Sequence, residues 1–392
     1  MERSMTKMIC KYQQVCPVIF GPDAVLEIGS KVKEFHGTKV LCIYDKGVEL
    51  SGIAEKIIRK IEDAGIDVYT FDKVMPDAPK EIIHEAGLMA QDKNIDIVVG
   101  IGGGSSLDTA KAVAVLADNP LPVSKYYAQF GTDYIKKTKL ILIPTASGTG
   151  SEVTAISVIH DEDTDAKETV LRPADMAIVD PVLTISAPPH ITAASGMDAL
   201  SHAIESFTTN CGNPKSDILA LHAMRLIFEN IEDAYVDGQN LEARTKLSLG
   251  SNFAGIAFND ASVHFGHAAA HEMGIRFHMP HGVACAITLP EVIMFSADVA
   301  PKKIYMIAEV IGIKDTEKIS LETTAKLAAE KIRNLMRKLN IKTLKEQGYS
   351  REEIVSCAKA AVEKNWFVSC ALKPVNVETM AQLLGKMYDD YQ

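Results

Sequence analysis

The sequence predicts two domains of different class: an α/β nucleotide-binding domain with a parallel sheet over residues 1–187, and an all-helical, metal-binding domain over residues 188–392. In the first half, short runs such as KVLCIYD (39–45) and IDIVVGIGGG (95–104) alternate with amphipathic helical stretches. Strands separated by helices of this length favour a parallel sheet whose faces are both covered. After Pro188 and Pro189 the patterns become helical, and we place the domain boundary there.

The individual elements follow from local patterns. IDVYTFD (66–72) reads as a strand, and KLILIPTASGTG (139–150) as a buried strand ending in small residues. GIAEKIIRKIEDAG (52–65) and PKEIIHEAGLMAQDK (79–93) have apolar residues at helical spacing. The helical patterns of the second half span residues 197–208, 214–231, 241–256, 261–274, 300–311, 321–338, 351–363 and 377–389.

Composition excludes several classes of function. The 392 residues are 47% hydrophobic and 23% charged, which is typical of a soluble globular protein. No apolar run reaches the roughly 18–20 residues of a membrane span, and the first residues lack a secretory layout, so we expect a cytoplasmic location. A net charge of −10 disfavours nucleic acid and anionic membranes as partners. The seven cysteines form no CxxC pair, which argues for reduced thiols and against a cysteine zinc site.

The stretch VVGIGGGSSLDTAKAVAV (98–115) joins a strand to a helix through a glycine-rich turn. Glycines let the backbone approach a ligand closely, and a helix N-terminus presents free N–H groups, so the turn predicts a pyrophosphate site. The turn does not fit G-x-G-x-x-G, and a tight turn needed only for packing is the alternative.

Two further strand ends support a nucleotide site. Asp45 ends an early strand, where a carboxylate can accept hydrogen bonds from the adenine-ribose hydroxyls and would repel a 2′-phosphate, favouring NAD over NADP. Taken alone, Asp45 is also explained as a turn residue before Lys46. The stretch PTASGTGSEVT (144–154) again places small hydroxyl residues after a strand. Three such loops at strand ends predict a crevice for a dinucleotide.

The second half contains a candidate metal centre. Asp198 and His202 stand four residues apart in GMDALSHAIESF (196–207), and His267 and His271 repeat that spacing in HAAAHEMG. This spacing puts each pair on one helix face. Five of the eleven histidines fall between residues 264 and 281, among them His281 in the loop MPHG. Imidazoles with one carboxylate suit iron or zinc, with a position left open for a substrate oxygen. Each pair alone is also explained as a surface accident or a side-chain hydrogen bond.

The motifs GGGSSLDTAKA, PTASGTGSEVT, GMDALSHAIESF and HAAAHEMG…FHMPHGVACAI resemble those of the iron-containing, group III alcohol dehydrogenase family in order and spacing. The resemblance implies a dehydroquinate synthase-like fold, a metal in the cleft between two domains, and an NAD-dependent alcohol dehydrogenase that is a dimer or larger homo-oligomer. It implies Fe²⁺ as the metal, with Zn²⁺ as the alternative, and a small alcohol or aldehyde as substrate.

Carried over by position, the resemblance assigns roles to individual residues. The implied metal ligands are Asp198, His202, His267 and His281. His271 matches a histidine that assists proton transfer without binding metal, and Asp108 an aspartate that faces the nicotinamide end. The positions that match nucleotide contacts are Asp45, Gly103, Gly104, Ser105, Thr145, Thr149 and Lys167.

The segment NDASVHFGH (259–267) departs from the family pattern, with Asp260 where Asn is usual and His264 where Gly is usual. His264 lies one turn before His267. Asp260 and His264 are therefore candidates for the substrate pocket, and they suggest a diol or hydroxy acid as substrate. A hydroxyacid–oxoacid transhydrogenase or a glycerol dehydrogenase of the same fold is the enzymatic alternative. The structural alternative is that His264 packs inside the helical domain. An NAD- and metal-binding regulatory protein is the non-enzymatic alternative.

Overall fold

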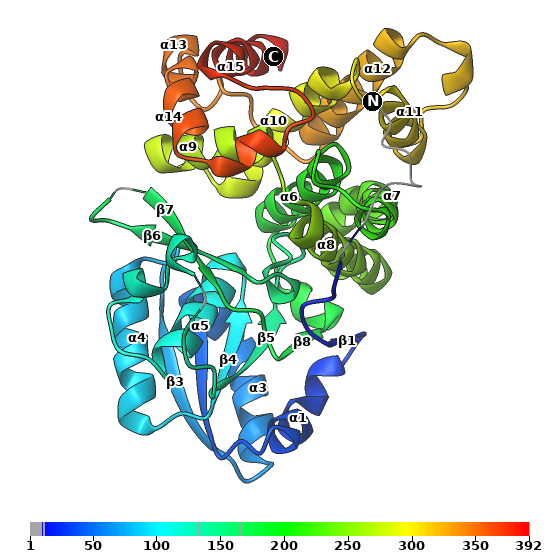
Figure 1. Ribbon diagram of the computed structural model, residues 1–392. Coiled ribbons are helices and arrows are strands. Elements are labelled where there is room, and N and C mark those ends of the chain that lie inside the picture. Colours follow the sequence, from blue (N-terminus) through cyan, green and yellow to red (C-terminus); the bar gives the residue numbers. More distant parts are fainter. Residues whose placement is uncertain (1–9, 11, 132, 165, 392) are drawn as a thin grey trace. The chain divides into compact units, whose positions relative to one another are not determined.

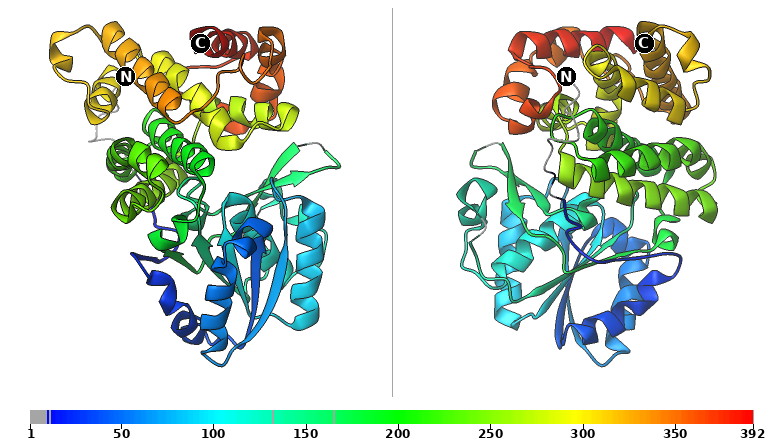
Figure 2. Two further views of the ribbon diagram at one scale, coloured as in Figure 1. Left: turned by 180° about the vertical axis from the view of Figure 1, so that it is seen from behind. Right: turned by 45° about the vertical axis from the view of Figure 1, so that its right-hand side comes forward.

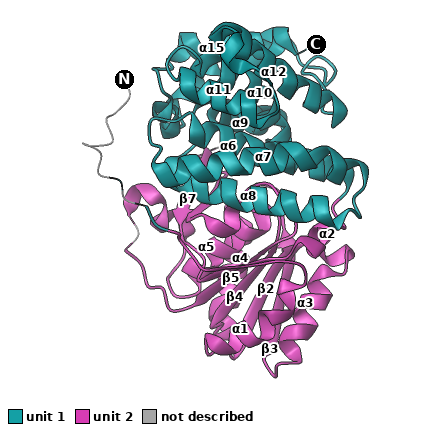
Figure 3. Ribbon diagram, turned by 90° about the vertical axis from the view of Figure 1, so that its right-hand side faces the viewer, with its two compact units in different colours: residues 1–13, 188–392 teal, residues 14–187 magenta. Residues whose placement is uncertain are grey.

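The structure is a computed structural model that describes residues 10, 12–131, 133–164 and 166–391. It contains two compact units, residues 14–187 and residues 188–392, and the described residues before 14 group with the second unit (Figure 3). The first unit is α/β with a parallel sheet and the second is helical, so the predicted fold class is confirmed. Among the described residues, no helix combines the length and the apolarity that a membrane span requires.

The first unit is built on a six-stranded sheet in which every pairing is parallel. In spatial order its strands are β1 (Val18–Phe20), β8 (Met176–Val179), β5 (Lys139–Pro144), β4 (Ile97–Gly102), β2 (Lys39–Asp45) and β3 (Asp67–Val74). A separate antiparallel hairpin consists of β6 (Ile156–Asp161) and β7 (Ala166–Leu171). The sequence patterns had indicated β2 to β5 and missed the short outer strands and the hairpin.

Helices cover both faces of this sheet (Figures 1 and 2). The side chains of β2, β4 and β5 that face α1 (Ile28–Glu34) and α3 (Ile53–Glu62) form one apolar cluster with them. On the other face, α5 (Gly104–Leu116) packs closely on β4. A Cβ at Gly100 would lie 2.6 Å from Cβ of Ala110. Glycine at position 100 therefore lets helix α5 settle onto the strand that ends in the glycine-rich turn.

The strand order places a switch point at the carboxyl ends of β2 and β4. The chain passes from β2 through α3 to its neighbour β3, then returns through α4 (Lys80–Lys93) to β4 on the opposite side of β2. Ligands of open α/β sheets bind at such points, outside the carboxyl ends of the strands. Asp45 ends β2, and Gly102 ends β4.

The second unit is a helical assembly around one apolar core. Its longer helices are α6 (Pro189–Phe207), α7 (Pro214–Val236), α8 (Leu241–Ala261), α9 (Phe265–Phe277), α10 (His281–Ser296), α11 (Pro301–Val310), α12 (Leu321–Lys338) and α15 (Val377–Asp390). Proline at the first position begins α6, α7 and α11, where its fixed φ suits a helix start.

Two expectations about this unit were wrong. His281, expected in a loop, is the first residue of α10. This helix was not predicted because its apolar run is continuous, shows no helical period and contains Pro290. The single helix expected over 351–363 is two short helices, α13 (Arg351–Val355) and α14 (Ala358–Glu363).

Candidate functional site

Helix α6 supplies three acidic or imidazole side chains from one face. Asp198, His202 and Glu205 stand at i, i+4 and i+7, and each is at most 5% exposed. Burial of two carboxylates and an imidazole in one helix is costly unless charges of opposite sign compensate them. Groups of opposite charge are therefore expected around this face of α6.

Three histidines converge on Asp198. Its Oδ1 atom lies 3.9 Å from Nε2 of His202, 3.7 Å from Nε2 of His267 on α9, and 3.6 Å from Nε2 of His281 at the start of α10. The ring of His202 is held in place by stacking on Phe258, with centroids 4.2 Å apart. The structure therefore brings one ring nitrogen of each predicted histidine ligand to within 3.9 Å of Oδ1 of Asp198.

Two of these donor atoms lack a hydrogen-bond partner among the described residues. Oδ1 of Asp198 and Nε2 of His267 are buried and make no hydrogen bond to any described part of the chain. A buried polar atom left without a partner costs about 1–3 kcal/mol. A divalent cation among the four side chains would satisfy both atoms, so the residues fit the iron or zinc that the sequence predicts.

Glu205 is a functional residue that sequence reasoning missed. Its Oε1 accepts a hydrogen bond from Nδ1 of His267 at 2.6 Å, and its Oε2 accepts one from the backbone N–H of His264 at 2.6 Å. Against the effect of burial, the imidazoles of His267 and His264 lower the pKa of Glu205 to about 2. The ionised carboxylate fixes a proton on Nδ1 of His267 and leaves Nε2 toward Asp198, as metal-binding histidines require.

The electrostatics of the centre favour a cation. Burial opposes ionisation of Asp198, yet His202, His281 and His267 hold the pKa of its carboxyl well below the usual range. Burial lowers the pKa of His267, but Cys285, Glu205 and Asp198 together raise it well above its usual value. The carboxylates of Glu205 and Asp198, which help to retain a proton on this imidazole, would equally attract a metal ion, whose binding would release that proton.

Cys285, which no sequence pattern singled out, adjoins the predicted metal ligands. It lies one turn after His281 on α10, is fully buried, and its Sγ is 3.5 Å from Nε2 of His281. The possible ligand atoms of Asp198, His267, His281 and Cys285 all lie within 4.8 Å of one another. Burial raises the pKa of the Cys285 thiol to about 12. The i, i+4 spacing of Cys285 from His281 was the feature of the sequence that could have identified it.

His271 adjoins the centre without facing Asp198. Its Nδ1 is 3.2 Å from Oδ1 of Asn365, and its ring centroid lies 5.4 Å from those of His281 and Phe367. Asn365 donates from Nδ2 to the carbonyl of Ala361, which turns its Oδ1 toward the imidazole. Asn365 lies 94 residues away in the sequence, and no local pattern predicts it.

The two residues expected in the substrate pocket have partners inside the helical unit. His264 is 1% exposed, and its Nε2 lies 3.1 Å from Oγ1 of Thr208. Asp260 forms an ion pair with Lys215 at 3.0 Å. The packed alternative therefore describes His264 better, and neither side chain supports an acidic or polar substrate.

In the first unit, the glycine-rich turn meets the other predicted nucleotide loops. Asp45 accepts from the backbone N–H of Val48 and from Oγ of Ser106, both at 3.0 Å. A Cβ on Gly104 would lie 2.8 Å from Cγ2 of Thr149. At Gly103 the backbone suits any residue, and a Cβ would meet no described atom within 4 Å. Packing alone does not require Gly103, and the open space at the start of α5 fits a bound phosphate.

Three more predicted cofactor residues surround this turn. Oγ of Ser105 accepts a hydrogen bond from the backbone N–H of Asp77 at 3.1 Å, and Lys167 on β7 pairs with Asp77 at 2.9 Å. The backbone N–H of Thr145 donates to the carbonyl of Gly102 at 3.0 Å. The cofactor-binding residues that the sequence predicts thus gather around the strand ends of this unit.

Asp108, predicted to face the nicotinamide, is bound within the first unit. Its Oδ1 accepts from Oγ of Ser151 at 2.7 Å and its Oδ2 from the backbone N–H of Val158 at 3.1 Å. Its carboxylate also lies 3.5 Å from Nζ of the buried Lys111. These bonds hold the turn after β5 and the hairpin against α5, and the catalytic role stays a prediction.

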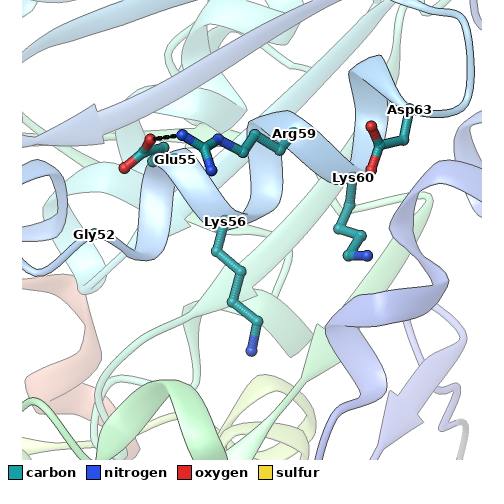
Figure 4. A pocket seen from close by; sticks show the side chains of 6 residues that line it. All are labelled: Gly52, Glu55, Lys56, Arg59, Lys60 and Asp63. Carbon is teal, nitrogen blue, oxygen red and sulfur yellow. Dashed lines mark hydrogen bonds and ion pairs between the residues drawn. The ribbon is translucent and has the colours of Figure 1, made fainter.

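A hollow also lies along α3, lined by Gly52, Glu55, Lys56, Arg59, Lys60 and Asp63 (Figure 4). Glu55 and Arg59 pair with each other there. The lining consists of one helix face with charges of both signs. It contains none of the predicted site residues.

A parallel α/β unit with a glycine-rich strand end, and a helical unit that gathers one carboxylate and three imidazoles, define a class of metal-dependent oxidoreductases. Two family models match the chain. Residues 17–181 match iron-containing alcohol dehydrogenase, and residues 192–388 match the C-terminal part of the Fe-containing alcohol dehydrogenase family. The chain belongs to the iron-containing alcohol dehydrogenase family and is a metal-dependent alcohol oxidoreductase.

Individual relatives agree with this assignment. The chain is 35% identical to a choline dehydrogenase of Bacillus subtilis over 88% of this chain and 86% of that protein. It is 33% identical to an NAD-dependent methanol dehydrogenase of Bacillus methanolicus over 88% of this chain and 91% of that protein. Among solved structures, a 1,3-propanediol oxidoreductase superposes with a TM-score of 0.92 at 30% identity, over 97% of this chain and all of the other.

Proposed function

We propose that this protein interconverts a primary alcohol and its aldehyde, with NAD(H) as the hydride carrier and a divalent metal ion held by Asp198, His202, His267 and His281. The observation that carries the proposal is the approach of three imidazole nitrogens to Oδ1 of Asp198, within 3.9 Å. Fe²⁺ is the proposed ion and Zn²⁺ the alternative, since both accept this ligand set.

NAD is the proposed cofactor because of the strand ends in the first unit. Asp45 stands at the switch point, where a carboxylate suits ribose hydroxyls and repels a 2′-phosphate. Gly103 leaves open space at the N-terminus of α5, where a pyrophosphate is favoured. The NAD dependence of the methanol dehydrogenase from Bacillus methanolicus supports the same choice. When bound, the nicotinamide ring would supply the hydride acceptor.

The side chains around the centre orient the reactants and move protons. When bound, a divalent ion would lower the pKa of an alcohol hydroxyl and polarise an aldehyde carbonyl. Glu205 holds His267 in the orientation that ligation needs. The side chain of His281 is 33% exposed, whereas that of Asp198 is 3% exposed, so the open side of the centre is the side of His281.

His271 is the proposed proton acceptor. Oδ1 of Asn365 accepts the hydrogen on Nδ1 of His271, so the second ring nitrogen, Nε2, is left basic. Histidine is the side chain that most commonly transfers protons in catalysis near neutral pH. Asn365 thus selects the tautomer that can take a proton released from an alcohol.

Small alcohols and diols are the proposed substrates. The names of the relatives, which act on choline, methanol and 1,3-propanediol, cover this range. The buried position of His264 gives no support to a hydroxy acid. A homo-oligomeric assembly and a cytoplasmic location stay predictions from the sequence.

Metal analysis with an activity screen tests this proposal. Protein purified without oxygen should contain about one iron or zinc per chain, as one four-ligand site holds one ion. It should form NADH from 1-propanol or 1,3-propanediol, and His267→Ala should lose both metal and turnover while still binding NADH. Metal-free protein that reduces an aldehyde with full activity would exclude the metal-dependent mechanism.

A further inference from the structure

Two cysteines far apart in the sequence lie face to face in the helical unit. Sγ of Cys211, in the connection between α6 and α7, is 3.3 Å from Sγ of Cys370, the last residue of the short helix η8 (Trp366–Cys370). A disulfide bond measures about 2.05 Å, so closing the gap needs a movement of only about 1 Å. Neither residue belongs to the metal centre or the nucleotide loops.

The backbone holds the two thiols in register. Thr209 and Ala371 form an antiparallel bridge. The backbone N–H of Asn210 donates to the carbonyl of Cys370 at 2.9 Å, and Nδ2 of Asn210 donates to the carbonyl of Ser369 at 2.8 Å. Oγ1 of Thr209 donates to the same Cys370 carbonyl at 3.0 Å. A network of main-chain and side-chain hydrogen bonds therefore holds the two segments that carry the sulfurs against each other.

The two thiols differ in access. Cys211 is exposed, whereas Cys370 is 2% exposed. Burial, and next the neighbouring Cys211 thiol, raise the pKa of Cys370 to about 11. An oxidant in solution therefore reaches Cys211 first, and Cys370 stands behind it as a protonated second thiol. This division of roles is that of an attacking and a resolving cysteine.

We propose that Cys211 and Cys370 form a reversible redox pair that a hydroperoxide converts into an intramolecular disulfide. The sulfur of Cys211 attacks one peroxide oxygen, the O–O bond breaks, and a sulfenic acid and one water result. The sulfur of Cys370 then attacks the sulfur of Cys211, the S–O bond breaks, and a second water leaves with the Cys370 proton. The two thiols lose two electrons, hydrogen peroxide becomes two waters, and a dithiol reductant reverses the oxidation.

The disulfide would join two segments that contact the candidate active site. Thr208, three residues before Cys211, bonds to His264, which in turn donates its backbone N–H to Glu205. Asn365, which orients His271, is the residue before η8, and Cys370 is the last residue of that helix. Oxidation would therefore link the segment that contacts His264 and, through it, Glu205 to the segment that carries Asn365, the residue that orients His271.

Peptide mapping of the whole metal-loaded protein tests the proposal. After reduction and removal of the reductant, a small molar excess of hydrogen peroxide should lower the chain mass by about 2 Da and yield a Cys211–Cys370 linked peptide, and dithiothreitol should reverse both. The linkage should be absent in Cys211→Ser and in Cys370→Ser. It should persist in Cys10→Ser, the control that removes a partly exposed thiol elsewhere.

The Cys211→Ser variant keeps the test decisive, because its exposed side chain lets it fold even where the buried Cys370→Ser variant does not. Circular dichroism and metal content equal to those of the parent protein establish that it has folded. Recovery of Cys211 as a sulfinic acid, or in a link between two chains, with Cys370 still a free thiol, would overturn the proposal.

Discussion

We expect the candidate metal centre and the glycine-rich strand ends to bind their ligands by different physical means. In the metal centre, buried charged side chains point at one another, and two of their polar atoms have no described protein partner. At the strand ends, the side chains of Asp45, Ser105 and Lys167 already bond to protein groups, and the ligand is left with backbone N–H groups and open space. The first site should respond most to changes of charge, and the second to changes of volume.

Asp198→Asn should have the largest effect. The change removes a negative charge that three imidazoles share, at a position that is 2% exposed. Loss of one partner from a buried charge cluster costs roughly 3–5 kcal/mol, so metal affinity should fall on the order of 1000-fold. Competition with a chelator of known affinity measures this change.

The matched control for that variant is Asp217→Asn. Asp217 also lies in the helical unit, but it pairs with Lys303 at 3.0 Å and is not one of the four predicted ligands. Its substitution should leave metal affinity within about twofold, as surface-type changes do. Equal losses in both variants would mean that the centre is not organised around Asp198.

Glu205→Gln should have the next effect, because Glu205 would act on a bound metal through His267. The amide can still accept from Nδ1 of His267, but the charge that makes the imidazole a strong donor is lost. Removal of such a supporting carboxylate weakens metal binding by roughly 10- to 100-fold. The buried Glu291, paired with Arg333 at 2.9 Å in the same unit, provides the control Glu291→Gln, which should lower stability and spare metal affinity.

Gly103→Ala tests the glycine-rich turn of the first unit. A Cβ at position 103 meets no described atom within 4 Å and suits the backbone there, so the free energy of unfolding should change by less than about 0.5 kcal/mol. The same methyl group would occupy the space left for the pyrophosphate, and NADH binding should weaken by roughly 30-fold, about 2 kcal/mol. Fluorescence titration with NADH, alongside an unchanged metal content, checks both. A variant that binds NADH like the parent would show that the open space is not the phosphate site.

The sequence predicted the metal centre better than its surroundings for physical reasons. Aspartate and histidine at helical spacing are chemically distinctive, so Asp198, His202 and His267 could be found by residue type and period alone. Glu205 and Cys285 obeyed the same spacing, at i+7 from Asp198 and i+4 from His281, and a search of the full helix face would have included them. Asn365 could not be found, because only the tertiary fold brings η8 to His271.

The fold shows the same limit. Long periodic helices and the buried strands β2 to β5 were readable, whereas β1 and β8 span only three and four residues and depend on their neighbours for pairing. Helix α10 was missed because its uniform burial erases the amphipathic period. Its first residue is the predicted ligand His281, so the missed helix start is a part of the candidate site.

Asp45→Asn should have the smallest effect and separates folding from recognition. Asparagine is as good an N-cap as aspartate, so it can still accept from Val48 at the start of α2 (Lys46–Leu50), and stability should hardly change. The charge that favours ribose hydroxyls and repels a 2′-phosphate is lost, and the preference for NADH over NADPH should fall about tenfold, the effect of one charge-assisted hydrogen bond. Asp45→Ala should lose the cap as well, at a cost of about 1 kcal/mol in the free energy of unfolding. The ratio of kcat/KM for the two cofactors measures the first effect and denaturant unfolding the second. An unchanged cofactor ratio in Asp45→Asn would assign Asp45 to the turn alone.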